Sequence, residues 1–353
     1  MISLKILRNE TELCKRLIAS KQDGVDLDHV LTLDKKLRQL KTISNEMRAE
    51  RNSASEAIGK LKKEGEDASN FIKKTRELGD DLKNIEKELH TVSKDLESYL
   101  YTLPNLPHES VPEGLDENFN VEIRSYGSKP EFNFEPKSHL DLGEALGLFD
   151  FQKGAKLSGS GFPLYIGKGA TLERYLINAM IEHHIQEFSF KEVFPPVLMK
   201  KESMITTGQL PKFEEDMYHT EVDNLYLAPT AEVPVTNIHR NEIISEDELP
   251  IYYVAYSPCF RRESGSYGKD TRGLLRVHQF NKVELVKFTT PEKSYEELES
   301  LTNQAESILQ KLGLHYRVVE LCTGDLSFSA AKCYDLEIWA PGEKRWLEVS
   351  SCS

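Results

Sequence analysis

The chain has 353 residues, of which 39% are hydrophobic and 29% charged. No segment approaches the roughly 18 consecutive apolar residues of a membrane span, so membrane proteins are excluded, as are collagen-like chains. The five cysteines are widely spaced without a C-x-x-C motif and the first residues carry no signal or transit pattern, which predicts a cytoplasmic protein with free thiols. The net charge of −13 is carried by residues 101–353, since residues 1–100 hold 20 basic against 19 acidic side chains; binding to DNA is therefore not expected, although a local basic element can still bind phosphates.

Residues 28–100 have the composition of helices, with no proline and a dense mixture of Lys, Glu, Arg and Asp. Gly65 is predicted to end a first helix, and Ser69 or Asn70 to cap a second. The pattern predicts an antiparallel hairpin with limbs about 50 Å long, although a heptad pattern by itself more often marks an oligomerisation coiled coil, and that alternative stays open. Apolar residues recur in the steps of four and three that make a coiled-coil seam, at Leu33, Leu37, Leu40, Met47, Ala54, Ile58 and Leu61, and again at Leu78, Leu82, Ile85, Leu89, Val92, Leu96 and Tyr99.

Three prolines in residues 102–116 forbid a continued helix and mark a domain boundary. We therefore place an N-terminal domain at residues 1–103, a linker at 104–130 and a second domain at 131–353. Amphipathic helices are predicted in this second domain at 171–188 and 294–312. Long helices are too few for regular βαβ alternation, so we expect an α+β fold built on an antiparallel sheet. The predicted strands are 162–166, 252–256, 279–286, 316–321, 334–339 and 345–349.

The segment 259–284 is a basic island in an otherwise acidic domain. Two strand-like ends flank a loop with three glycines. A polyanion is the expected ligand of such a loop, since arginine forks suit phosphates; the alternative is an ordinary solvated loop. No Walker A motif occurs, so a P-loop is excluded. The cationic side chains are Arg261, Arg262, Lys269, Arg272, Arg276 and Lys282.

Five short motifs occur in the order typical of one enzyme family. Arg261-Arg-Glu263 and the loop 265–280 match motif 2 of the class II aminoacyl-tRNA synthetases in its seryl form, and Thr230-Ala-Glu232 matches a serine-site T-x-E. Phe190–Pro196 looks like motif 1, and Glu348–Ser353 looks like the start of motif 3. The chain therefore resembles the seryl-tRNA synthetases over its whole length.

This resemblance implies a serine–tRNA ligase that forms seryl-adenylate from L-serine and ATP with Mg²⁺ and then esterifies serine tRNA, and also selenocysteine tRNA where one exists. It implies a homodimer formed through residues 190–196, and tRNA binding by the helical arm and the basic motif 2 loop. The residues that the resemblance assigns are Arg261, Glu263 and Arg276 to catalysis; Thr230, Ala231, Glu232 and Glu284 to L-serine; Arg261, Arg262, Glu263, Val277, Phe280, Glu348, Val349, Ser350 and Ser351 to ATP; and Glu348 and Ser351 to the metal ion.

Physical chemistry agrees with these implied roles. Arg261 would bridge the α-phosphate and the serine carboxylate, a bidentate task that suits a planar guanidinium. Glu263 would face the adenine amino group, and Phe280 would stack on adenine. Taken singly, each residue also has an ordinary structural role available: Glu284 as a paired strand acid, and Thr230 as a helix cap.

The last residue, Ser353, lies just inside the motif 3 match. The resembling family continues there into a strand and a helix that carry an arginine for the γ-phosphate. We therefore expect the chain to be a C-terminally incomplete form of a synthetase. The alternative is a shortened, catalytically inactive relative that acts as a tRNA-binding or regulatory protein.

Overall fold

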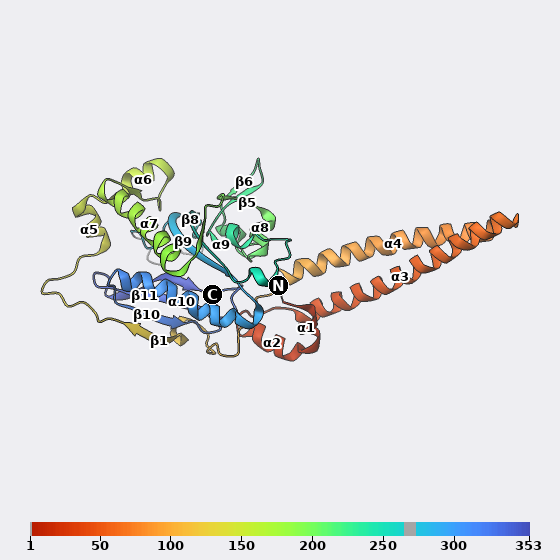
Figure 1. Cartoon of the computed structure of the whole chain (residues 1–353), viewed down its shortest axis with the longest axis horizontal. Helices are drawn as coiled ribbons and strands as arrows, with labels where there is room; N and C mark the ends of the chain where they lie inside the picture. Colours follow the sequence, from red (N-terminus) through yellow and green to blue (C-terminus); the bar gives the residue numbers. More distant parts are fainter. Residues whose placement is uncertain (1, 265–272) are drawn as a thin grey trace. The chain divides into compact units, whose positions relative to one another are not determined.

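A computed structural model of the chain describes residues 2–264 and 273–353 (Figure 1). The chain divides into two compact units, Met1–Leu106 and Pro107–Ser353. No helix in the described part is long and apolar enough to cross a membrane.

The N-terminal unit is helical. Two short helices, α1 (Leu4–Asn9) and α2 (Thr11–Ala19), precede two long ones, α3 (Leu27–Glu64) and α4 (Ser69–Leu100), which Figure 1 shows as an antiparallel pair. The 38 residues of α3 correspond to about 57 Å, so the predicted hairpin is confirmed. Its apolar core lies at the base of the hairpin and includes Leu7, Cys14, Ile18, Leu27, Val30, Leu37, Leu40, Val92, Leu96 and Leu100.

At the turn between the long helices, the predicted end of α3 is confirmed but the predicted cap of α4 is not. Gly65 is the C-cap of α3 in the left-handed conformation, with φ of 75°, as expected. The predicted cap of α4 by Ser69 or Asn70 is wrong, because Ala68 occupies the cap position without a side-chain hydrogen bond. Asp67 supplies the acceptor instead: its Oδ1 accepts from Ser69 N at 2.9 Å.

The C-terminal unit is built on antiparallel sheets, which confirms the predicted α+β class. A four-stranded sheet has the order β1-β10-β11-β12, and a three-stranded sheet has the order β4-β8-β9, in which only β4 and β8 are parallel. The first comprises β1 (Val121–Tyr126), β10 (Tyr316–Glu320), β11 (Tyr334–Ala340) and β12 (Arg345–Cys352); the second comprises β4 (Lys191–Val193), β8 (Ile251–Phe260) and β9 (Gln279–Phe288).

Smaller elements surround these two sheets. The predicted strand at 162–166 is reduced to β3, Leu164–Tyr165. The helices are α5 (His139–Leu146), α6 (Phe151–Ser158), α7 (Lys168–Phe188), α8 (Lys201–Thr206), α9 (Glu232–Thr236) and α10 (Ser294–Lys311), with 3₁₀ turns η1 (Glu117–Phe119), η2 (Glu214–Asp216), η3 (Glu246–Glu248) and η4 (Pro291–Lys293). The remaining strands are β2 (Phe149–Asp150), β5 (Leu198–Lys200), β6 (His219–Thr220) and β7 (Leu225–Leu227).

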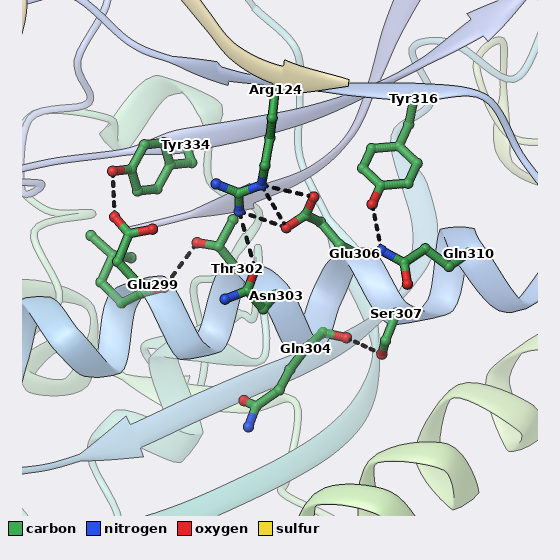
Figure 2. A network of polar contacts seen from close by, with 11 residues as sticks. Arg124, Glu299, Thr302, Asn303, Gln304, Glu306, Ser307, Gln310, Tyr316 and Tyr334 are labelled. Atoms are coloured by element: carbon green, nitrogen blue, oxygen red, sulfur yellow. Dashed lines mark hydrogen bonds and ion pairs between the residues drawn. The ribbon is translucent and has the colours of Figure 1, made fainter. Parts of the chain in front are cut away.

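Helix α10 is fixed to the four-stranded sheet by polar contacts as well as by apolar packing (Figure 2). Arg124 from β1 donates to both carboxylate oxygens of Glu306, the shortest contact being 2.6 Å, and Glu306 is buried. Gln310 donates to the hydroxyl of Tyr316 at 2.8 Å. A buried carboxylate without a partner would destabilise the fold. The pairing of Arg124 with Glu306 therefore stabilises the packing of β1 against this helix.

The end of α7 carries a buried histidine that makes stability depend on pH. His184 is 3% exposed among Phe188, Phe190 and His183, and its Nδ1 has no hydrogen-bond partner in the described part of the chain. Burial, and secondarily the neighbouring His183, lowers the pKa of His184 from 6.5 to about 4. Between about pH 4 and pH 6.5 the unfolded chain therefore binds a proton at this residue that the folded chain does not.

We predict that the free energy of unfolding falls by about 2 kcal/mol between pH 7 and pH 5 from this residue alone. Urea unfolding at both pH values measures it. His184→Leu should reduce this pH-dependent loss, whereas replacement of the exposed His90 should leave it unchanged. An equal pH dependence in His184→Leu would contradict the assignment.

Candidate active site

A cavity of about 970 Å³ lies within the C-terminal unit. Its walls come from β9, β12, α9, the first half of α10, the segment that follows β8, and the segments 207–217, 229–230 and 327–332. Residues far apart in the sequence thus share one space. The residues proposed from the sequence that line it are Thr230, Glu232, Arg261, Glu263, Arg276, Glu284, Glu348 and Ser351.

Arg261 directly follows β8 and is held by its backbone and its side chain. Its N–H donates to the carbonyl of His278 at 3.0 Å, and its Nε donates to the carbonyl of Pro229 at 3.2 Å. The guanidinium lies 5.1 Å from the centre of the Phe280 ring. These contacts place a permanent cation beside an aromatic face in the cavity.

Glu263 adopts a left-handed backbone with φ of 51°, which is uncommon for a residue other than glycine. Its carboxylate meets Arg276, with 3.0 Å between Oε2 and Nη1. The residues 265–272 of the predicted motif 2 loop, including Lys269 and Arg272, lie outside the described residues.

Two polar side chains, those of Thr230 and Lys282, meet at one oxygen of Glu284. Thr230 Oγ1 donates to Glu284 Oε2 at 2.7 Å, and Lys282 Nζ lies 2.7 Å from the same oxygen. Thr230 Oγ1 also accepts from the N–H of Glu232 at 3.1 Å. Thr230 therefore bonds both to the first residue of α9 and to Glu284, and it is 3% exposed.

Glu232 lies close enough to Glu284, Lys282 and Arg261 for their charges to shift its pKa. Burial raises the pKa of Glu232, and the neighbouring Glu284 raises it further, while Lys282 and Arg261 oppose the shift. An ammonium ion entering this pocket would therefore be attracted by both carboxylates.

The cavity wall at β12 is acidic, because both β12 and its neighbouring strand β11 carry carboxylates. Asp335 pairs in register with Ser351, and Glu337 with Glu348. Burial, followed by the charge of Glu348, raises the pKa of Asp335 to about 7. Burial also raises the pKa of Glu348, against the lowering effect of Arg261. The excess of carboxyl oxygens favours a cation here.

Several residues assigned by the resemblance do not line the cavity. Ala231 is fully buried in an apolar cluster, and Val277 is 7% exposed. Arg262 turns away: its Nε donates to the carbonyl of Met217 at 3.2 Å, and its guanidinium lies over the ring of Tyr218. Val349, Ser350 and Phe280 are likewise not among the residues that line the cavity. Phe280 contacts Arg261, which does line it.

Other lining residues were missed from the sequence. Lys282 was assigned only to the basic island, although strand alternation places it on the same face of β9 as Phe280 and Glu284. Asp216 and the segment 327–332 line the cavity without any sequence signal.

Comparisons with known proteins agree with the motifs. Residues 1–107 match the family described as seryl-tRNA synthetase N-terminal domain, and residues 212–353 match the class II tRNA synthetase core domain (G, H, P, S and T). A serine–tRNA ligase of Geobacillus kaustophilus is 54% identical over the whole chain, which covers 84% of that relative. The chain belongs to the seryl-tRNA synthetase family.

Solved structures of the family have the same fold. A seryl-tRNA synthetase of Pyrococcus horikoshii, complexed with ATP, aligns over 99% of this chain and 83% of its own, with a TM-score of 0.92 and 37% identity. A cytoplasmic serine–tRNA ligase of Naegleria fowleri, in complex with AMP, aligns with a TM-score of 0.86 and 27% identity, over 100% of this chain and 85% of its own.

Proposed function

We propose that the chain is a serine–tRNA ligase, which activates L-serine with ATP and transfers the seryl group to serine tRNA. The observation that carries this proposal is the convergence of Arg261 with the Thr230–Glu284–Lys282 cluster in one cavity. The first is suited to phosphate and carboxylate groups, and the second to a small amino acid with a hydroxyl and an ammonium group. An inactive relative would have no need for both sets, so we disfavour that alternative.

The nucleotide end of the cavity would be formed by Arg261, Arg276 and Glu263, with Phe280 beside Arg261. When the serine carboxylate attacks the α-phosphate, the bond to the β-phosphate breaks, pyrophosphate leaves, and negative charge accumulates around the reacting phosphate. Arg261 would neutralise that charge from a fixed position, where a preorganised cation is most effective. Phe280, already beside Arg261, offers an apolar face to the adenine.

A magnesium ion fits the acidic wall. Among the described residues no group of three or more His, Cys, Asp or Glu side chains is arranged to hold a metal ion, and Mg²⁺ in such enzymes commonly takes one or two protein oxygens together with substrate phosphates. Glu348 and Ser351 would supply those oxygens, and the bound ion would offset phosphate charge. The nearby Asp335 and Glu337 add negative potential.

The serine end would be formed by Glu232, Glu284 and Thr230. The ammonium group of serine would pair with the carboxylates, and its hydroxyl would hydrogen-bond to a polar group of the pocket. Alanine has no hydroxyl and would leave that polar group unpaired, so the pocket would discriminate against alanine.

We predict that Glu284→Gln raises the KM for serine about 10- to 100-fold with little change in the KM for ATP, because it removes a charged partner while keeping the shape. Serine-dependent ATP–pyrophosphate exchange measures both constants. Glu292→Gln, an exposed acid on η4, is the matched control. Equal rises in both constants, or none, would refute the serine pocket.

The arm and a second subunit complete the proposal. The helical hairpin and the basic motif 2 loop would bind tRNA, with selenocysteine tRNA as a further substrate where it exists. The segment 190–196 would form a dimer interface, which is supported by Phe194 at 79% exposure and by Tyr175 of the adjoining α7 at 67%. The five free cysteines suit a reducing compartment such as the cytoplasm.

A further inference from the structure

The strained residue Glu263 is held by an acidic residue from a different part of the chain. Asp216, at the end of η2, accepts from both residues that flank Glu263: the N–H of Arg262 donates to the Asp216 carbonyl at 2.9 Å, and the N–H of Ser264 donates to Asp216 Oδ1 at 2.8 Å. The hydroxyl of Ser264 donates to the same Oδ1.

These bonds bracket Glu263 on both sides. A left-handed conformation at a residue with a side chain persists only where its surroundings hold it. Asp216 does this with its backbone on one side and its carboxylate on the other, and the bond from Arg262 Nε to the carbonyl of Met217 adds a third attachment to the same turn.

The turn itself is firmly anchored. Leu210 and Met217, which stand on either side of it, are buried in one apolar cluster together with Met204 and Tyr226. The N–H of Asp216 donates to the carbonyl of Phe213 at 3.0 Å. The turn is therefore a fixed support, while the motif 2 segment that it holds carries the charged side chain into the cavity.

We propose that Asp216 is a positioning residue for the nucleotide: it holds Glu263 in the orientation that reads the adenine amino group, and so sets the preference for ATP over a purine nucleotide without that group. This inference rests on the proposed function of Glu263. Asp216 acts through Arg262 and Ser264, and its effect should depend on the amino group of the ligand.

The test compares ATP with purine riboside triphosphate, which lacks the 6-amino group, as ligands of the full chain in equilibrium binding. Asp216→Ala should raise the Kd for ATP about fivefold, the effect of a lost exposed, charge-assisted hydrogen bond. Its Kd for purine riboside triphosphate should match that of the unmodified chain. Asp216→Asn, which keeps an acceptor oxygen, should restore ATP binding, and Glu215→Ala, an exposed acid on the same turn, should have no effect.

Two controls make the outcomes distinct. Glu263→Ala should show the same loss specific to ATP; if it does not, the proposed role of Glu263 fails, and this inference fails with it. If Glu263→Ala behaves as expected but Asp216→Ala weakens both nucleotides equally, or neither, the positioning role alone is overturned. Ser264→Ala removes only the hydroxyl bond of an exposed residue, and it should give a smaller loss specific to ATP, about twofold, even if Asp216→Ala unfolds.

Discussion

Arg261→Ala is expected to reduce serine-dependent ATP–pyrophosphate exchange by about 10³-fold or more, with the loss in kcat rather than in the KM for serine. The reason is geometric. The Arg261 side chain is fixed by Pro229 and lies beside Phe280, so its charge needs no reorganisation when negative charge grows at the reacting phosphate. Removal of such a preorganised group costs mainly transition-state stabilisation.

The matched variants separate charge from shape. Arg261→Lys keeps the charge but loses the planar fork, and we expect most of the loss to remain. Arg76→Ala removes an equal charge from an exposed position on α4 and should leave exchange unchanged. Near-normal exchange in Arg261→Ala would refute the assigned role, whereas a large loss in Arg76→Ala would point to a general electrostatic effect.

The long-range fold followed from sequence where a pattern repeats over many residues. The seam of four and three steps predicted α3 and α4, and Gly65 was identified as the helix end because a left-handed cap favours glycine. The scarcity of long helices after residue 116 predicted the antiparallel sheets. The cap of α4 was missed because Asp, Ser and Asn are all good cap residues, and three of them lie within four positions there.

The site was predictable in composition but not in orientation. Arg261 and Arg262 are neighbours with the same chemistry, yet one lines the cavity and the other bonds to Met217, a difference set by the backbone after β8. The positive φ of Glu263 has no sequence signal, since glycine is absent there. Strand alternation could have found Lys282 beside Glu284, because both lie on one face of β9.

The second large effect is expected at the helical arm. We predict that replacing residues 52–82 with a short Gly-Ser linker lowers affinity for serine tRNA about 100-fold while changing ATP–pyrophosphate exchange by less than about twofold. The cut lies beyond the ion pair between Arg48 and Glu86, so the base of the hairpin and its apolar core are kept. The cavity belongs to the other compact unit, which is why amino acid activation should survive.

The same variant decides between the two roles that a heptad seam allows. Residues 1–100 carry nearly equal numbers of acids and bases, so the arm would recognise RNA by shape and selected contacts rather than by net charge. If the arm binds tRNA and residues 190–196 hold the dimer, the shortened chain should sediment as a dimer and lose only tRNA binding and aminoacylation. If the hairpin is instead the oligomerisation element, the shortened chain should sediment as a monomer. Unchanged tRNA affinity in the shortened chain would remove the arm from the proposed function altogether.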